Sequence, residues 1–89
     1  MPTVTFTPNL RRHVPCPTHN VPGDTVREVL ENAFELAPQL RSYILDEQGE
    51  VRHHIVLFLN GSAVLDRKRL AEPIAPQETL HVYQALSGG

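Results

Sequence analysis

The sequence is poor in cysteine, aromatic residues and positive charge, and each shortage excludes a class of protein. Its 89 residues include one cysteine, no tryptophan, three phenylalanines and two tyrosines. The single cysteine, Cys16, cannot form an internal disulfide, which favours a reducing cytoplasm over a secreted location. Five aromatic residues and a formal net charge of -2 provide neither a base-stacking platform nor a polycation. We therefore predict that the chain binds no nucleic acid.

Long apolar runs and targeting signals are also lacking. The longest apolar run, residues 55–59, has the length of a strand and is far short of the roughly 20 residues that span a bilayer. Met1-Pro2-Thr3 does not begin a basic segment followed by an apolar one, so we expect no signal peptide. With 40% hydrophobic and 20% charged residues, the composition is that of one small globular domain. We expect it in the cytoplasm and away from membranes.

Apolar periodicity predicts one amphipathic helix. Thr25 and Glu28 have the spacing of a capping box, which satisfies backbone N–H groups in the first turn. Proline excludes the preceding residue from helical conformations, so Pro38 ends the helix. Between them, apolar residues recur every three or four positions: Val26, Val29, Leu30, Ala33, Phe34 and Ala37. We expect a further turn over residues 38–45 that buries Leu40, Ile44 and Leu45.

Alternating and β-branched residues predict strands on both sides of this helix. The predicted strands cover residues 3–7, 19–21, 51–59, 62–64 and 79–85. Asn60-Gly61 is typical of a tight hairpin turn, because both residues tolerate positive φ. The order of elements predicts an α+β fold in which one main helix packs on a small mixed sheet.

The sequence ends in Ser87-Gly88-Gly89, directly after the last predicted strand. Glycine lacks a side chain that would hinder entry into a narrow channel, and it adopts conformations closed to other residues. From Leu86 to Gly89 the chain reaches about 13 Å when extended. The glycines alone are equally typical of a frayed end without a function. We predict a folded domain over residues 1–86 and a flexible tail over residues 87–89.

The order of elements and several motifs together point to one family. The motifs are Leu10-Arg11, Gly23-Asp24-Thr25-Val26 with Val29-Leu30, Phe58-Leu59-Asn60-Gly61 and the terminal Gly-Gly. They resemble the ThiS/MoaD family of sulfur carriers, which are β-grasp proteins like ubiquitin. Two further segments and the length are most similar to the branch that includes CysO, the carrier for a cysteine synthase: Pro38-Gln39-Leu40-Arg41 and Gly49-Glu50-Val51-Arg52.

This resemblance implies a carrier that is not an enzyme and whose reactive position is the carboxylate of Gly89. A carboxylate is ionised at neutral pH and is a poor electrophile, so it must first be activated. In the family, an E1-like enzyme adenylates the terminal glycine with ATP, and a sulfur donor displaces AMP to leave a thiocarboxylate. The acceptor pathway stays open among cysteine, molybdopterin, thiamin and tRNA thiolation. The chain itself is expected to need no cofactor.

The resemblance also implies partners and a surface for them. The partners are the E1-like enzyme, a sulfur-accepting biosynthetic enzyme and a sulfurtransferase or desulfurase, with the free chain a monomer. Alternate residues of a strand point to opposite faces of the sheet, and the face turned away from the helix is unusually apolar. Such patches mark interaction surfaces. The predicted partner-binding residues are Val56, Phe58, His81, Tyr83 and Ala85.

Two other functions stay open at this stage. A protein modifier joined through Gly89 to a lysine would begin with the same adenylate, whereas a β-grasp interaction module would not need the glycines. No combination of nucleophile, base and orienting group indicates an enzyme. The histidines lack the spacing of a metal site, so we predict no metal: His13, His19, His53, His54 and His81.

Overall fold

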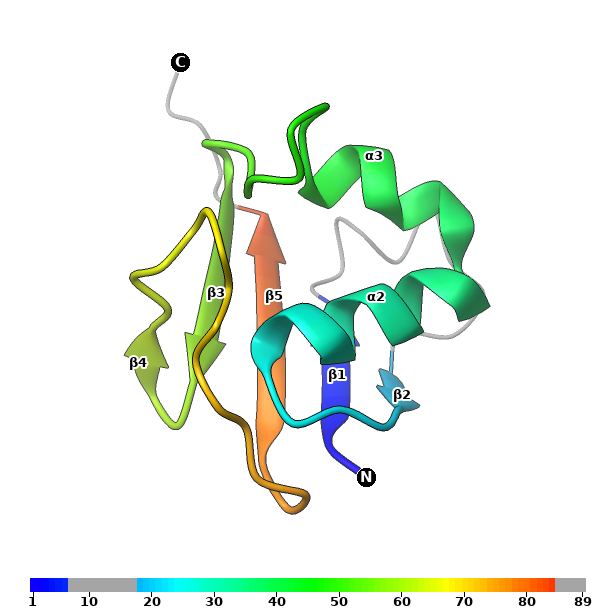
Figure 1. The fold of residues 1–89 in the computed structure, drawn as a ribbon, viewed down its shortest axis with the longest axis vertical. Coiled ribbons are helices and arrows are strands. Elements are labelled where there is room, and N and C mark those ends of the chain that lie inside the picture. The colour runs from blue at the N-terminus through cyan, green and yellow to red at the C-terminus, as the bar shows by residue number, and fades with distance from the viewer. Residues whose placement is uncertain (7–17, 85–89) are drawn as a thin grey trace.

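The structure is a computed structural model that describes residues 1–6 and 18–84. In this part of the chain one mixed sheet has the strand order β2-β1-β5-β3-β4 (Figure 1). Strands β1 and β5 run parallel, and the other neighbouring pairs are antiparallel. The strands are β1 (Thr3–Phe6), β2 (Thr18–Asn20), β3 (Ile55–Leu59), β4 (Ser62–Ala63) and β5 (Thr79–Gln84). The mixed sheet that the sequence predicted is confirmed.

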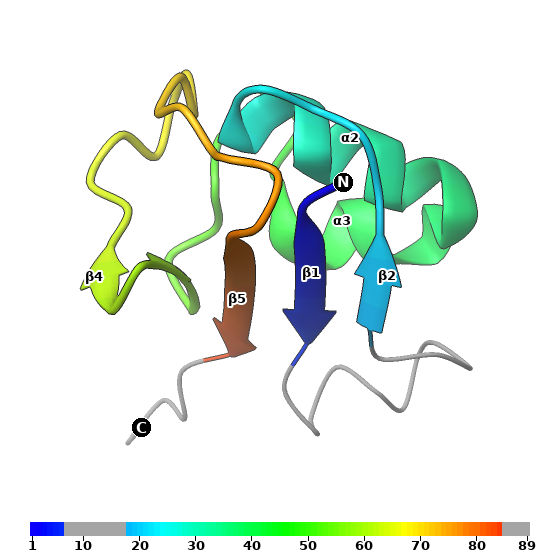
Figure 2. The ribbon, with the colours of Figure 1, turned by 90° about the horizontal axis from the view of Figure 1, so that it is seen from below.

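Helix α2 (Val26–Leu36) is followed by the short 3-10 helix η1 (Pro38–Leu40) and by α3 (Arg41–Ile44). Figures 1 and 2 show α2 and α3 on the same side of the sheet. The capping box is confirmed, because the Thr25 hydroxyl accepts from the Glu28 N–H at 3.2 Å. In a capping box the Glu28 carboxylate would accept from the N–H of Thr25. Here it accepts instead from the N–H of Asp24, one residue earlier, at 2.8 Å.

The core lies between the sheet and the helices. Every apolar residue of the predicted helical stripe is buried, as are Leu40, Ile44 and Leu45 in the turn that follows. The sheet contributes alternate residues of its central strands: Val4, Phe6, Ile55, Leu57, Leu80 and Val82. Because burial of one Leu or Ile side chain contributes about 1.5 to 3 kcal/mol, this shared core fixes which face of each strand meets the helices.

The predicted strand over residues 51–59 is too long, because β3 begins only at Ile55. Val51 makes an isolated bridge with Leu45, and the Ile55 N–H donates to the Arg52 carbonyl at 3.0 Å. His53 therefore lies in a turn rather than in a strand. The cause is non-local: Arg52 Nε donates to the Ser42 carbonyl at 2.7 Å and ties this segment to α3.

The hairpin between β3 and β4 has the predicted form. Asn60 and Gly61 have φ values of 56° and 78°, and Leu59 pairs with Ser62 across the turn. Strand β2 begins one residue earlier than predicted, at Thr18. Several sequence predictions lie outside the described residues, among them Thr7 as the end of β1, Ala85 as the end of β5, the Leu10-Arg11 motif, Cys16 and the tail over residues 87–89.

Candidate functional site

One face of the sheet is turned away from the helices, and the alternation of β3 defines it. Ile55, Leu57 and Leu59 point into the core, with 0%, 1% and 8% of their surface exposed. Val56 and Phe58 lie between them and are half-buried on the other side. The structure therefore confirms the predicted register of the strand.

An aromatic cluster covers the apolar half of this open face. Phe58 lies directly opposite His81, and Val56 lies opposite Tyr83 on the neighbouring strand β5. The Phe58 and Tyr83 rings meet edge to face with centroids 5.3 Å apart, and the His81 ring stacks on Tyr83 at 6.1 Å. These are preferred aromatic geometries, so the four side chains form an ordered surface. Tyr83 is 41% exposed.

The other half of the open face carries hydroxyl and amide groups instead. Thr3 donates its hydroxyl hydrogen to Asn20 Oδ1 at 2.7 Å, and Thr18 Oγ1 donates to Thr5 Oγ1 at 3.3 Å. In the sheet register, Thr5 pairs with His81, where the two halves meet. Among the described residues of this face, the apolar side chains therefore lie on β3, β4 and β5.

Two apolar residues belong beside this surface and were missed by the sequence prediction. Ala63 pairs with Phe58 and is exposed on the same face. Leu65, two residues further, is 86% exposed, whereas Val64 between them is only 3% exposed. The alternation at residues 63–65 is the signal that would have found them.

The predicted tail begins at the end of β5, beside the start of β3. Gln84 pairs with Ile55, and Ile55 directly follows the turn at Arg52 and His53. The remaining predicted site residues lie outside the described part of the chain: Ala85, Leu86, Ser87, Gly88 and Gly89. We call the pair Ile55 and Gln84 the tail root.

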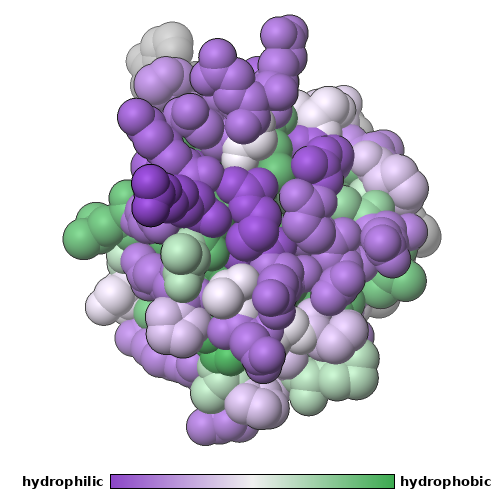
Figure 3. Space-filling view, viewed as in Figure 1, coloured by the Kyte–Doolittle hydropathy of each residue, from purple (hydrophilic) through white to green (hydrophobic). Residues whose placement is uncertain are grey.

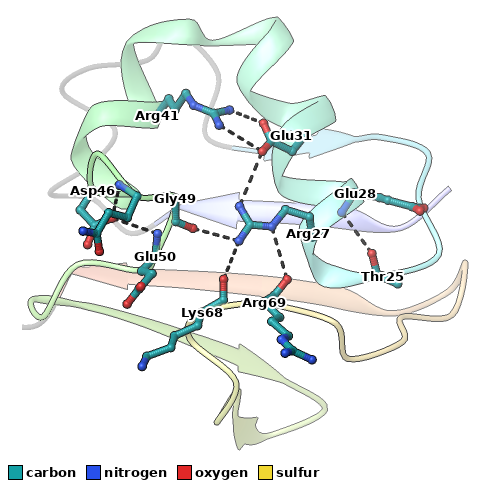
Figure 4. A network of polar contacts seen from close by, with 11 residues as sticks. Thr25, Arg27, Glu28, Glu31, Arg41, Asp46, Gly49, Glu50, Lys68 and Arg69 are labelled. Atoms are coloured by element: carbon teal, nitrogen blue, oxygen red, sulfur yellow. Dashed lines mark hydrogen bonds and ion pairs between the residues drawn. The ribbon is translucent and has the colours of Figure 1, made fainter.

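An arginine at the start of α2 holds two loops together (Figure 4). Arg27 Nη2 donates to the carbonyls of Gly49 at 2.9 Å and Lys68 at 2.8 Å. Its Nε donates to the Arg69 carbonyl at 3.4 Å, and its guanidinium pairs with Glu31 at 3.6 Å. Arg27 is therefore structural, and its charge is used inside the fold.

Three carboxylates near these loops have lowered pKa values. A hydrogen bond from Arg41 lowers the pKa of Glu31. Hydrogen bonds from the backbone N–H groups of Arg69 and Ala71 lower the pKa of Asp66. A hydrogen bond from the backbone N–H of Glu50 is the largest cause of the lowered pKa of Asp46. Each is stabilised as a carboxylate by donors.

The remainder of the described surface offers no enclosed site. The helix side is covered mostly by hydrophilic residues (Figure 3). Within residues 1–6 and 18–84, no three histidine, cysteine or acidic side chains are placed to hold a metal ion. In the same ranges, no helix is long and apolar enough to cross a membrane. An open depression of about 440 Å³ adjoins the 52–54 turn.

Comparison with known proteins gives matches in structure only. No family model matches the sequence, and no curated protein matches it. A chain of the Amycolatopsis orientalis BexX/CysO complex superposes with a TM-score of 0.86 at 21% identity, over 100% of both chains. SAMP1 from Haloferax volcanii gives 0.81 at 27% identity, over 99% of this chain and 98% of that one. The chain has the ubiquitin-like β-grasp fold.

The β-grasp assignment confirms the fold that the motifs implied. Mycobacterium tuberculosis CysO also superposes, with a TM-score of 0.83 at 20% identity over 97% of this chain and 100% of that one. Proteins named CysO thus stand among the structural neighbours, as the resemblance to that branch predicted. SAMP1 is described as a small archaeal modifier protein. The CysO structures, at 20% and 21% identity, show the fold alone, whereas the 27% identity to SAMP1 makes this chain similar to a modifier protein.

Proposed function

We propose that this chain is a sulfur carrier whose Gly89 carboxylate is adenylated by an E1-like enzyme and converted to a thiocarboxylate. One observation supports this most directly. Strand β5 ends at Gln84, directly before the predicted tail, and carries His81 and Tyr83 of the ordered apolar face, where Tyr83 is 41% exposed. A partner that grips this face has the tail within reach. The chain is then a substrate, and its partners supply the catalysis.

The proposed chemistry takes place at one carbon atom. A carboxylate oxygen of Gly89 attacks the α-phosphorus of ATP, and pyrophosphate leaves. A sulfur donor at the oxidation level of sulfide then attacks the carbonyl carbon, the bond to the AMP oxygen breaks, and AMP leaves. The thiocarboxylate next transfers its sulfur to an acceptor held by a biosynthetic enzyme. We place these steps in the cytoplasm, which a chain with one cysteine fits.

A protein modifier is the second candidate, and the likeness to SAMP1 favours it. That neighbour is 27% identical to this chain over almost the full length of both. In this case a lysine amine, instead of sulfur, attacks the activated carbonyl of Gly89. The product is an isopeptide bond to another protein, so the two functions differ after a shared first step.

Adenylation with a candidate E1-like enzyme tests the proposal. The chain is incubated with ATP, the enzyme and a sulfide source, and its intact mass is measured. A mass gain equal to one sulfur minus one oxygen, located at Gly89, is expected for a carrier. Slower-migrating conjugates in cell extract would instead favour a modifier.

The matched controls for this experiment change only the end of the chain. A Gly89→Ala variant, and a chain extended beyond Gly89, should fold like the wild type and release little AMP. Undiminished AMP release by Gly89→Ala would overturn the proposal. Partner binding that survives deletion of Gly88 and Gly89, without any adenylation of the wild type, would identify a plain interaction module.

A further inference from the structure

The basic side chains of the described residues fall into two groups. Four are engaged by the protein itself: Arg27, Arg41, Arg52 and Arg67. Lys68 and Arg69 differ, because both are exposed and their side chains have no hydrogen bond or ion pair with residues 1–6 or 18–84. Two adjacent free cations are notable in a chain with a formal net charge of -2.

The turn that carries these cations is firmly held by its backbone. The Asp66 carboxylate accepts from the N–H groups of Arg69 at 2.9 Å and Ala71 at 3.2 Å. Leu70 is fully buried and has a φ of 55°, a conformation that costs a non-glycine residue about 1 kcal/mol or more. Arg27 binds the carbonyls of Lys68 and Arg69.

These contacts leave the side chains of Lys68 and Arg69 to project outward. Figure 4 shows both pointing away from the Arg27 guanidinium. Their backbone carbonyls are used by the fold, whereas their charged groups are not. Selection for stability alone does not require two free cations here.

The turn also lies beside the tail root. The Val51 N–H donates to the Arg67 carbonyl at 2.9 Å, and Arg67 Nη2 donates to the Ile55 carbonyl at 2.6 Å. Ile55 in turn pairs with Gln84. Lys68 therefore lines the depression of about 440 Å³ together with residues 52–54, which directly precede Ile55 of the tail root.

Acidic residues near the turn offset these cations only in part. Asp46 and Glu50 line the same depression, but Asp46 accepts from the N–H groups of Gln48 at 2.8 Å and Glu50 at 3.0 Å. The Asp66 carboxylate is likewise occupied by its own turn. The side chains of Lys68 and Arg69 therefore offer two exposed positive charges to a partner.

We propose that Lys68 and Arg69 bind carboxylates on the activating enzyme, around the mouth of the channel that receives the tail. The inference rests on the proposed function, because it names a second contact of the same partner. Paired rim charges mainly speed association and fix orientation, and salt screens them. The apolar face of β3 and β5 would hold the enzyme, and the two cations would turn the tail toward its channel.

A charge-removal variant tests this contact. The probe is the enzyme that adenylates the wild-type chain, and AMP formation is measured at 50 and 300 mM KCl, concentrations chosen on either side of about 0.15 M physiological salt. The variant K68Q/R69Q should raise the KM for the chain about threefold to tenfold at low salt, with kcat unchanged. The difference should shrink at high salt. The control Q39E/Q77E makes the same change in net charge on exposed residues elsewhere.

Each outcome separates this inference from the proposed function. Equal KM values for K68Q/R69Q and the wild type, or an equal rise for the control, would overturn the contact and leave the carrier function standing. No adenylation of the wild type by any E1-like enzyme would overturn both. An unchanged KM with salt-dependent binding of a single-stranded oligonucleotide, lost in K68Q/R69Q, would assign the turn to nucleic acid instead.

Discussion

At the scale of single residues, Gly23 shows how close packing restricts the sequence. Its φ is 151°, and a Cβ built there would lie 2.8 Å from Val29 Cγ2 and 2.9 Å from Val29 N. The helix thus begins so close to the preceding chain that no side chain fits between them. Glycine in the Gly23-Asp24-Thr25-Val26 motif has this physical cause.

We expect Gly23→Ala to lower the free energy of unfolding by about 3 kcal/mol, because it adds both backbone strain and a steric clash. Gly61→Ala is the matched control. Gly61 has a φ of 78° but nothing within 4 Å of its built Cβ, so it should lose only about 1 kcal/mol. Urea denaturation measures both variants. Equal losses would show that the close contact with Val29 costs nothing.

Arg27 gives a second prediction at this scale. Arg27→Met keeps the aliphatic stem but removes the bonds to three loop carbonyls, and it should cost about 2 kcal/mol. Arg41→Met removes the other partner of Glu31, but that side chain is 51% exposed, so the loss should stay below about 1 kcal/mol. Thermal unfolding measures which variant loses more stability. A larger loss in Arg41→Met than in Arg27→Met would show that the ion pair with Glu31 is the important contact.

At the scale of elements, the face of β3 and β5 is the testable unit. Phe58→Asp places a charge within the aromatic cluster, where Tyr83 lies 5.3 Å away between ring centroids. It should raise the KM for activation at least about tenfold while the chain stays folded, because interface aromatics carry much of the binding energy. Thr79→Asp, on the same face of β5 but paired with Thr3 of the hydroxyl half, is the control. Circular dichroism checks the fold, and normal activation of a folded Phe58→Asp would refute the docking role.

Elements set by local pattern could be predicted from the sequence, and elements set by distant contacts could not. The stripe from Val26 to Ala37 and the turn at Asn60-Gly61 depend on neighbours in the chain, so periodicity and turn chemistry were sufficient. The turn at Arg52 depends on Ser42, which lies ten residues away in sequence. Similarly, no residue type or turn motif near Leu70 in the sequence predicts its positive φ.

The candidate site was predicted in part for the same reason. Alternation of β3 placed Val56 and Phe58 on the open face, because period-two patterning is a property of one strand. Leu65 was missed because it lies beyond the end of β4. The free cations of Lys68 and Arg69 were invisible in sequence, since only the structure shows which other arginines are already engaged. The role of Gly89 stays a prediction.

At the scale of the whole molecule, three carboxylates make stability depend on acid. The pKa values of Glu31, Asp46 and Asp66 are lowered by folding. Their contribution is therefore present above the ordinary values of 4.5 and 3.8. It is lost as the pH falls through the lowered pKa values of the folded chain.

We expect the urea midpoint to be nearly constant between about pH 5 and pH 7 with respect to these groups, and to fall below about pH 4. In Asp66→Asn the urea midpoint should fall less steeply below about pH 4, because the variant lacks one of the groups whose proton uptake drives unfolding. Glu35 is an exposed helix residue, and in Glu35→Gln the urea midpoint should fall with acid as it does in the wild type. A midpoint that rises on acidification would contradict the assigned directions.

The parallel pairing of the first and last strands has a consequence for synthesis on the ribosome. Thr3 pairs with Thr79, so β1 lacks its parallel partner in the sheet until residues 79–84 have been made. Pairing over such a separation is slow to form. The aromatic cluster also needs His81 and Tyr83, which are translated just before the glycines. Under the proposed function, an activating enzyme that docks on the assembled face of β3 and β5 would ignore chains that stop before residue 79, because they lack half of that face.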